Sequence, residues 1–149
     1  MNTVAYPQKP NHVSQHGVTT IEEPWFEEYL MSHVNHAAQI LQVDCGDGRF
    51  TRRVAEQRTG AWVVGLEQDS RFFVQARSNL NSLANAVAIH GDPGDMPFAS
   101  DEFGVAFTSL AISDSNQRQR VLAEMTRVVR PGGKVIVCSG SPTALRICK

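Results

Sequence analysis

The chain has 149 residues, 42% of them hydrophobic and 19% charged, with a formal net charge of -1. This length fits one domain with a buried core, and the balanced charge, without any run of Lys and Arg, argues against nucleic-acid binding. No stretch is long and apolar enough to cross a membrane, and the three widely spaced cysteines favour neither a disulfide framework nor a metal site, so we expect a reduced, cytoplasmic protein.

The N-terminal part of the chain is polar and contains two prolines. Residues 1–20 are therefore predicted to form a flexible arm, and residues 21–149 a single domain. From Trp25 to Val34, apolar residues recur with the spacing of one helix face. A helix is thus expected to open the domain.

Short apolar runs and amphipathic stretches then alternate along the chain. The apolar runs, each of which predicts a strand, are residues 40–43, 62–66, 86–89, 105–110 and 135–138. The amphipathic stretches predict helices with the inner faces Phe50, Val54 and Ala55, then Phe72, Phe73, Ala76 and Leu80, and finally Val121, Leu122, Met125, Val128 and Val129. Asp69 or Ser70 is expected to cap the middle one of these helices. The alternation predicts an α/β fold, with a mostly parallel sheet of about five strands and helices on both faces.

The strongest local motif follows the first apolar run. Residues 43–51 read Val-Asp-Cys-Gly-Asp-Gly-Arg-Phe-Thr, which places a glycine-rich turn between a strand and a helix. Glycines at such a turn let the backbone approach a ligand closely, although structural turns use them as well. Glu67 ends the second apolar run, where an acidic side chain either binds two ribose hydroxyls or lies in solvent. The pair suggests nucleotide binding and leaves a structural turn as the alternative.

Further motifs extend the pattern through the second half of the chain. Gly91-Asp92-Pro93 and Met96-Pro97-Phe98 follow the third run, and residues 127–134 read Arg-Val-Val-Arg-Pro-Gly-Gly-Lys. In order and spacing, residues 40–137 resemble the class I S-adenosylmethionine (SAM)-dependent methyltransferases, particularly the branch that acts on small molecules. The resemblance implies a Rossmann-like, doubly wound sheet with the first and fourth strands at its centre.

The resemblance also implies SAM as the cofactor and a set of residues that bind it. Gly46 and Gly48 would let the backbone approach the methionine part of SAM, and Glu67 would hold the ribose hydroxyls. Asp92 would accept a hydrogen bond from the adenine amino group, and apolar residues near Met96 would line the adenine ring. No catalytic residue is identified, because methyl transfer from a sulfonium is a direct displacement that depends on alignment.

Four positions depart from the family pattern. Gln42 stands at the usual acidic position, and Asp44 at the first glycine and so within the implied cofactor site. Asp44 either intrudes on the cofactor or replaces the charge missing at Gln42. A shifted register, in which Asp44 is itself the acidic residue, is the alternative alignment. Pro93 lacks the backbone N–H that relatives use at the adenine, and Gly104 replaces a frequent Asp.

The C-terminal end of the chain is short for this family. Only eleven residues follow Cys138, so the resemblance implies that the last two strands of the usual seven-stranded sheet are missing. The fifth strand would then be an open edge, favouring a homo-oligomer or a protein partner there.

Three functions are compatible with these motifs. The first is a SAM-dependent methyltransferase acting on an unidentified small molecule, and the second is a non-catalytic subunit of the same fold that binds a protein partner. The third, an NAD-dependent oxidoreductase, is disfavoured because Thr51 replaces the third glycine of that fingerprint. Asp114 stands where relatives carry substrate-facing groups, or it is an ordinary turn residue.

Overall fold

The computed structural model describes residues 2–5, 24–34, 36–108, 115–138 and 143–148. Its helices and strands, in chain order, are β1 (Asn2–Ala5), α1 (Pro24–His33), β2 (Gln39–Val43), α2 (Arg49–Gln57), β3 (Trp62–Glu67), α3 (Ser70–Leu80), β4 (Ala86–His90), β5 (Phe103–Thr108), α4 (Ser115–Val128), β6 (Val129–Cys138) and β7 (Thr143–Cys148). The five strands and the helices predicted from the sequence are all present, with residues 109–110 of the fourth predicted strand outside the described ones. Val129, predicted on the face of the last helix, is instead the first residue of β6.

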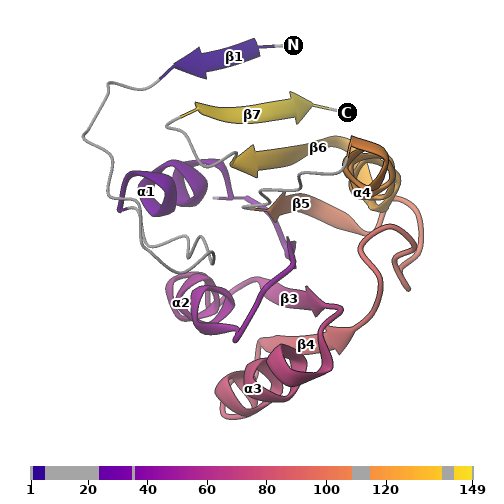
Figure 1. Ribbon diagram of the computed structural model, residues 1–149. Helices are drawn as coiled ribbons and strands as arrows, with labels where there is room; N and C mark the ends of the chain where they lie inside the picture. The colour runs from indigo at the N-terminus through magenta and orange to yellow at the C-terminus, as the bar shows by residue number, and fades with distance from the viewer. Residues whose placement is uncertain (1, 6–23, 35, 109–114, 139–142, 149) are drawn as a thin grey trace.

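One sheet joins all these strands in the order β1-β7-β6-β5-β2-β3-β4 (Figure 1). The five strands from β6 to β4 are parallel, whereas β7 and β1 are antiparallel to their neighbours. The first and fourth predicted strands, β2 and β5, pair at the centre, as the Rossmann-like prediction requires. The helices that follow these two strands, α2 and α4, pack on opposite faces of the sheet, and such a switch point opens a crevice at the carboxyl ends of the strands.

The register brings the ends of the central strands to one edge of the sheet. Val43, the last residue of β2, pairs with Leu66 on one side and with Thr108 on the other. Glu67, the last residue of β3, pairs with His90, the last residue of β4. The segments that follow these strands therefore start side by side.

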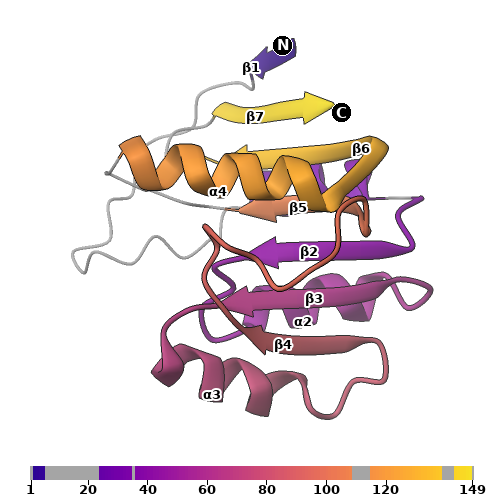
Figure 2. The same cartoon turned by 90° about the vertical axis from the view of Figure 1, so that its right-hand side faces the viewer.

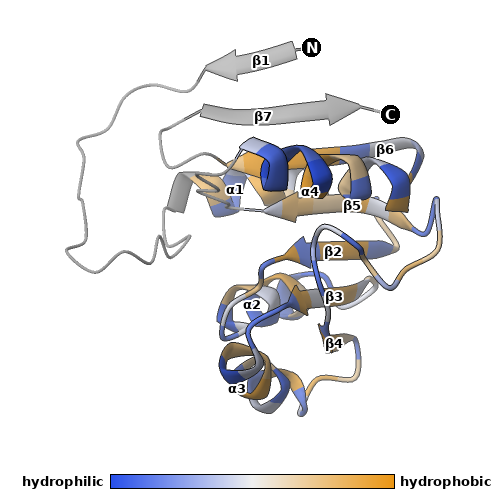
Figure 3. Cartoon of the chain, turned by 45° about the vertical axis from the view of Figure 1, so that its right-hand side comes forward, coloured by the Kyte–Doolittle hydropathy of each residue, from blue (hydrophilic) through white to orange (hydrophobic). Residues whose placement is uncertain are grey.

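Helices cover both faces of the sheet, as predicted. Helices α1, α2 and α3 lie on one face, and α4 lies on the other together with the 91–102 connection (Figures 1 and 2). Phe26, Leu30 and Val54 belong to the buried cluster beneath the first three helices, and Val121 and Met125 to the cluster beneath α4. Figure 3 shows apolar residues along β3 and β5 and polar residues over much of α4.

Helix α3 differs from its predicted face at one residue. Ala76 and Leu80 are buried and Phe73 is partly buried, but Phe72 is 37% exposed. The Phe73 ring packs on His90, the last residue of β4, at 5.1 Å between centroids. The start of α3 thus lies beside the end of β4, and the preceding Phe72 remains partly in solvent. Of the two expected caps, Asp69 caps the helix through a bond from the Arg71 N–H.

Strand β6 starts six residues earlier than predicted because it contains a bulge. Val129 pairs with Phe103 and Lys134 with Val105, so residues 130–133 lie opposite the single residue Gly104. A Cβ atom on Gly133 would lie 2.7 Å from the Gly104 carbonyl oxygen. The glycine at position 133 is therefore required for this bulge to pack on β5.

The prediction of an open fifth-strand edge is wrong. Strand β7 pairs with β6 from Lys134↔Cys148 to Cys138↔Ala144, and β1 pairs with the outer side of β7. The tail folds back because an antiparallel strand satisfies backbone groups that the edge of β6 would leave unpaired. Of the two strands implied to be missing after Cys138, one is present as β7, whereas β1 comes from the other end of the chain. The pairing of β7 with β6 removes the argument for association through β6. Asn2–Ala5 form β1, which differs from the flexible arm predicted for residues 1–20, and residues 6–20 lie outside the described ones.

Candidate functional site

The glycine-rich turn between β2 and α2 adopts a backbone that glycine favours at three positions. Asp44, Gly46 and Gly48 all have positive φ angles, of 53°, 58° and 78°. The Cys45 N–H donates to the Leu66 carbonyl at 3.0 Å, and the Gly48 N–H donates to the Cys45 carbonyl at 3.1 Å. These bonds hold the turn against the end of β3 and lead directly into α2.

The two glycines of this turn have different surroundings. A Cβ atom on Gly46 would meet no atom within 4 Å, whereas one on Gly48 would lie 2.9 Å from the Cα atom of Ala76. Gly48 therefore permits the close approach of α2 and α3. Gly46, by contrast, faces free space at the carboxyl edge of the sheet, where a ligand can approach its backbone.

Glu67 ends β3 and holds this edge together. Its side chain is 5% exposed. One carboxylate oxygen accepts the Gly46 N–H and the other accepts the Asp69 N–H, each at 2.8 Å. Glu67 thus links the turn after β2 to the start of α3, and its contact with a ribose stays a prediction.

Asp44, the residue after β2, is half-buried and has one buried carboxylate oxygen. Its Oδ1 atom has no hydrogen-bond partner among the described residues. Burial, followed by the nearby charges of Glu67 and Asp92, raises the pKa of Asp44 from 3.8 to about 6. A positive φ angle at this position supports the alignment that places Asp44 at the family's first glycine, because aspartate is one of the few other residues that tolerate it.

Gln42, at the position that is usually acidic, has a buried side chain that is hydrogen-bonded within the protein. It is 3% exposed, and its Oε1 atom accepts a 2.6 Å hydrogen bond from the Thr51 hydroxyl on α2. The side chain therefore ties β2 to α2. Because Gln42 carries no charge, Asp44 would supply the negative charge for a ligand at this turn.

Thr108 is a polar residue at this edge that the sequence reading did not single out. It is the last residue of β5 and is 1% exposed, and its hydroxyl has no hydrogen-bond partner among the described residues. Buried polar groups are nearly always paired, so an unpaired one invites an explanation. Asp44 and Thr108 supply two such groups, one beside each central strand. A hydroxyl that ends an otherwise apolar strand was the available sequence signal.

Asp92 lies near this cluster but is exposed. Its carboxylate accepts the Gly94 N–H at 2.7 Å and lies 3.7 Å from the guanidinium of Arg120. The electrostatic effect of Asp92 on Asp44 places both acids in one region. The preceding Gly91 N–H donates to the Glu67 carbonyl, which fixes the segment that bears Asp92 to the end of β3.

Met96 is buried against α4, at 4% exposure. Its backbone N–H donates to Glu124, and Arg127 donates to the carbonyl oxygens of Met96 and Phe98 at 3.1 and 2.9 Å. An ion pair of 2.7 Å joins Arg127 to Glu124. This network positions the connection between β4 and β5, and contact of Met96 with a ligand stays a prediction. Asp114 lies outside the described residues.

Other chemistries find little support in the described part of the chain. Burial, followed by the charge of Glu67, raises the pKa of the Cys45 thiol to about 12, which suits a packed side chain and not a nucleophile. Within the same residues, no group of three or more His, Cys, Asp or Glu side chains is arranged to hold a metal ion. None of the described helices has the length and apolar character needed to cross a membrane.

Comparisons with known proteins agree on one family. A family model described as a methyltransferase domain matches residues 41–137. The demethylmenaquinone methyltransferase of Tropheryma whipplei is 32% identical over 111 residues, covering 74% of this chain and 45% of the relative. The malonyl-[acyl-carrier protein] O-methyltransferase of Erwinia pyrifoliae is 31% identical over 111 residues, covering 73% of this chain and 40% of the relative.

A solved structure shares the fold of this chain. The PH0226 protein from Pyrococcus horikoshii matches with a TM-score of 0.68 and 26% identity, over 75% of this chain and 50% of that one. The chain thus spans half or less of the length of each of these proteins.

Proposed function

The chain belongs to the class I SAM-dependent methyltransferase family, and from this membership we propose that it binds SAM at the carboxyl ends of β2, β3 and β4 and transfers the methyl group to a small molecule. The observation that supports the proposal most directly is the free space at Gly46. The N–H of Gly46 is bound by the Glu67 carboxylate, and Asp44, two residues earlier in the same turn, has an oxygen without a partner among the described residues.

The residues at this edge fit the parts of SAM. The Asp44 carboxylate would accept a hydrogen bond from the ammonium group, and it would thereby replace the charge that Gln42 does not supply. Glu67 would hold the ribose hydroxyls while one of its oxygens keeps the Gly46 N–H in place. Asp92 and the segment near Met96 would contact the adenine, with Pro93 contributing no hydrogen-bond donor.

Methyl transfer from SAM does not depend on a side chain that acts as an acid or a base. SAM supplies a methyl group already activated on a sulfonium, so the protein must align the acceptor and exclude water. The turn and Glu67 would fix the position of the donor, and Thr108 would offer a hydroxyl at the centre of the crevice. Such a reaction does not require a catalytic acid or base among these residues.

The methyl acceptor is proposed to be a small molecule, without a more specific identity. The two relatives described above act, by their names, on demethylmenaquinone and on a malonyl group carried by a protein, and both are methyltransferases. Neither name fixes the substrate of a chain that spans less than half of those proteins. A cytoplasmic location is part of the proposal, and the free, buried thiol of Cys45 supports it.

A non-catalytic subunit of the same fold is the second candidate. It is favoured by the Glu67 carboxylate, both of whose oxygens already accept backbone N–H groups, and by Gln42, which is tied to Thr51. In this case the cofactor edge would be a structural remnant, and the chain would act by binding a protein.

Calorimetry with S-adenosylhomocysteine, the demethylated product, separates the two candidates. We expect binding with a dissociation constant of about 10–100 μM, which corresponds to roughly 5–7 kcal/mol. Amide shifts of Gly46 and Asp69 in an NMR titration would place the ligand at this edge. Absence of heat at millimolar ligand, from a chain that still unfolds cooperatively, would reject the enzyme and favour the second candidate.

A further inference from the structure

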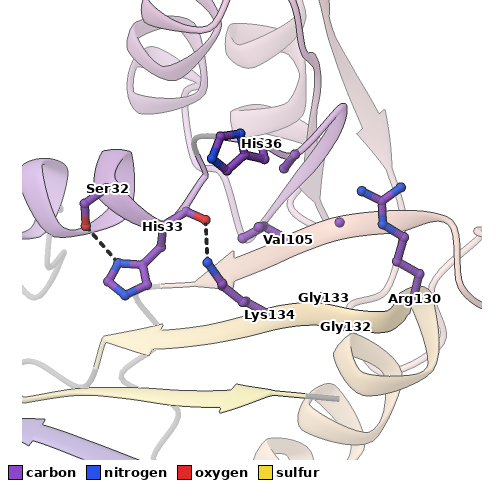
Figure 4. A pocket seen from close by; sticks show the side chains of 10 residues that line it. Ser32, His33, His36, Val105, Arg130, Gly132, Gly133 and Lys134 are labelled. Atoms are coloured by element: carbon purple, nitrogen blue, oxygen red, sulfur yellow. Dashed lines mark hydrogen bonds between the residues drawn. The ribbon is translucent and has the colours of Figure 1, made fainter.

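A cavity lies at the opposite end of the strands from the turn at Gly46. Its volume is about 200 Å³, and it lies between the end of α1, the start of β5 and the bulge of β6 (Figure 4). Nothing in the proposed methyl transfer uses this region. Its chemistry therefore needs its own explanation.

The polar side chains around the cavity are mainly basic. Arg130 and Lys134 from β6 line it together with His33 and His36 from the end of α1 and the segment after it. Lys134 is held by a 3.1 Å hydrogen bond from its ammonium group to the His33 carbonyl. Figure 4 shows the side chains of Arg130 and Lys134 extending from β6 on the side where His36 lies.

No carboxylate balances these charges within the described part of the chain. The cavity lining contains no Asp or Glu, and neither Arg130 nor Lys134 takes part in any ion pair among the described residues. By contrast, Arg120 and Arg127, which belong to α4, both have acidic partners. Arg130 is thus a guanidinium directed at a cavity without a counter-charge.

Gly104 makes room for this guanidinium. It lies opposite the bulge, and a Cβ atom there would be 3.0 Å from the Nη2 atom of Arg130. Relatives often have an aspartate at this position, where this chain has Gly104. A carboxylate at residue 104 would lie against Arg130 and neutralise it, so the glycine leaves both the space and the charge free.

The size and charge of the cavity select the ligand. Sites for drug-sized molecules usually have volumes of about 300–1,000 Å³, which exceeds this cavity. The planar fork of an arginine and the point charge of a lysine are both well suited to phosphate oxygens. We propose that the cavity binds a phosphate-class oxyanion, either free phosphate or the end of a small phosphate monoester, at a site separate from the cofactor edge.

NMR titration of the full-length, ¹⁵N-labelled chain tests this inference. Inorganic phosphate should produce saturable shifts at the amides of Gly132 and Gly133, with a dissociation constant of the order of millimolar at low ionic strength. Glycerol phosphate in a parallel titration separates the two sources, because tighter binding than phosphate would indicate the monoester. Linear shifts without saturation, or shifts spread evenly over the surface, would overturn the proposal.

Two variants and one control sharpen the result. Arg130→Gln should weaken phosphate binding by about tenfold, and Gly104→Asp should abolish it by pairing with Arg130. Arg77→Gln removes one positive charge from the exposed face of α3 and should leave the affinity unchanged. Equal affinity in Arg130→Gln and the parent, or equal losses in Arg130→Gln and Arg77→Gln, would reject the site. If Gly104→Asp does not fold, Arg130→Gln and its control still decide.

The test is independent of SAM binding. The phosphate shifts should persist when S-adenosylhomocysteine is present, and the Gly46 amide should not respond to phosphate. Competition between the two ligands would instead place phosphate at the cofactor edge and overturn the inference.

Discussion

The backbone N–H of Gly46 donates a 2.8 Å hydrogen bond to the carboxylate of Glu67. This bond crosses from the turn after β2 to the end of β3, and the second oxygen of the same carboxylate accepts the Asp69 N–H. One side chain therefore fixes the start of two connections. In the proposed contact with a ribose, the Glu67 carboxylate would already be held in position by these two hydrogen bonds.

Glu67→Gln should cost both stability and affinity. A glutamine has one acceptor oxygen, so one of the two N–H groups would face an amide NH₂ and lose its partner. We expect a loss of about 1–3 kcal/mol in the free energy of unfolding and roughly tenfold weaker S-adenosylhomocysteine binding. Urea unfolding and calorimetry measure the two effects. The exposed Glu56, paired with Arg52, provides a control, since Glu56→Gln should change stability by less than about 1 kcal/mol. Matching results for both variants would contradict the role of Glu67.

Alanine substitutions should separate the two glycines of the turn. Gly48→Ala should destabilise the chain by about 2–4 kcal/mol, because the new methyl group would meet the Ala76 backbone in a left-handed conformation. Gly46→Ala meets no atom and should cost only the conformational term of about 1–2 kcal/mol. Its main effect should be a loss of ligand affinity of tenfold or more, because the methyl group would occupy the space proposed for SAM. Thermal unfolding and calorimetry on both variants would show whether the effects divide in this way.

Asp44→Asn should stabilise the chain above pH 6. The folded-state pKa of about 6 exceeds the ordinary 3.8, so ionisation of Asp44 costs stability as the pH rises through this interval. The cost is complete above pH 6, at roughly 2–3 kcal/mol, and it disappears below about pH 4. Asparagine tolerates the positive φ angle and carries no charge, so the gain should be seen at pH 8 and not at pH 4. A gain that does not depend on pH would point to packing instead of charge.

The same carboxylate should make ligand binding depend on pH. If ionised Asp44 binds the ammonium group, the affinity for S-adenosylhomocysteine should rise between pH 5 and pH 7, by up to about tenfold per pH unit at the acidic end. Asp44→Asn should remove this rise and bind more weakly at pH 7. Calorimetry at several pH values measures the affinity of the parent chain and of Asp44→Asn as a function of pH. Tighter binding by Asp44→Gly than by the parent would mean that the side chain obstructs the cofactor.

The sequence was sufficient to predict the parallel core because its strands are short apolar runs with clear boundaries. The tail was not predictable in the same way. Thr143–Cys148 forms a strand only because β6 offers an unpaired edge, and Asn2–Ala5 depends in turn on that strand. The pairing of β1 with β7 joins the two ends of the chain, and no local pattern reveals such a contact, whereas β7 follows β6 directly along the chain and pairs with it as the next strand.

The site shows the same division between local and distant information. The turn from Asp44 to Gly48 was recognisable because its residues are contiguous, and the positive φ angle of Asp44 agrees with its alignment to a glycine. The bond between Gln42 and Thr51 was not predictable, nor was the approach of Gly104 to Arg130. Each depends on how a helix or a bulge packs on a neighbouring strand.

The pairing of β1 with β7 makes the stability of the sheet hierarchical. Among the described strands, β7 is the only neighbour of β1, and β7 itself is joined to the parallel core through β6. Detachment of β1 leaves the bonds between β7 and β6 intact, whereas detachment of β7 releases both outer strands at once. Local opening can therefore proceed inward from this edge in two steps. The strands that carry Asp44 and Glu67 lie beyond β5, so they can remain folded while the two ends of the chain separate.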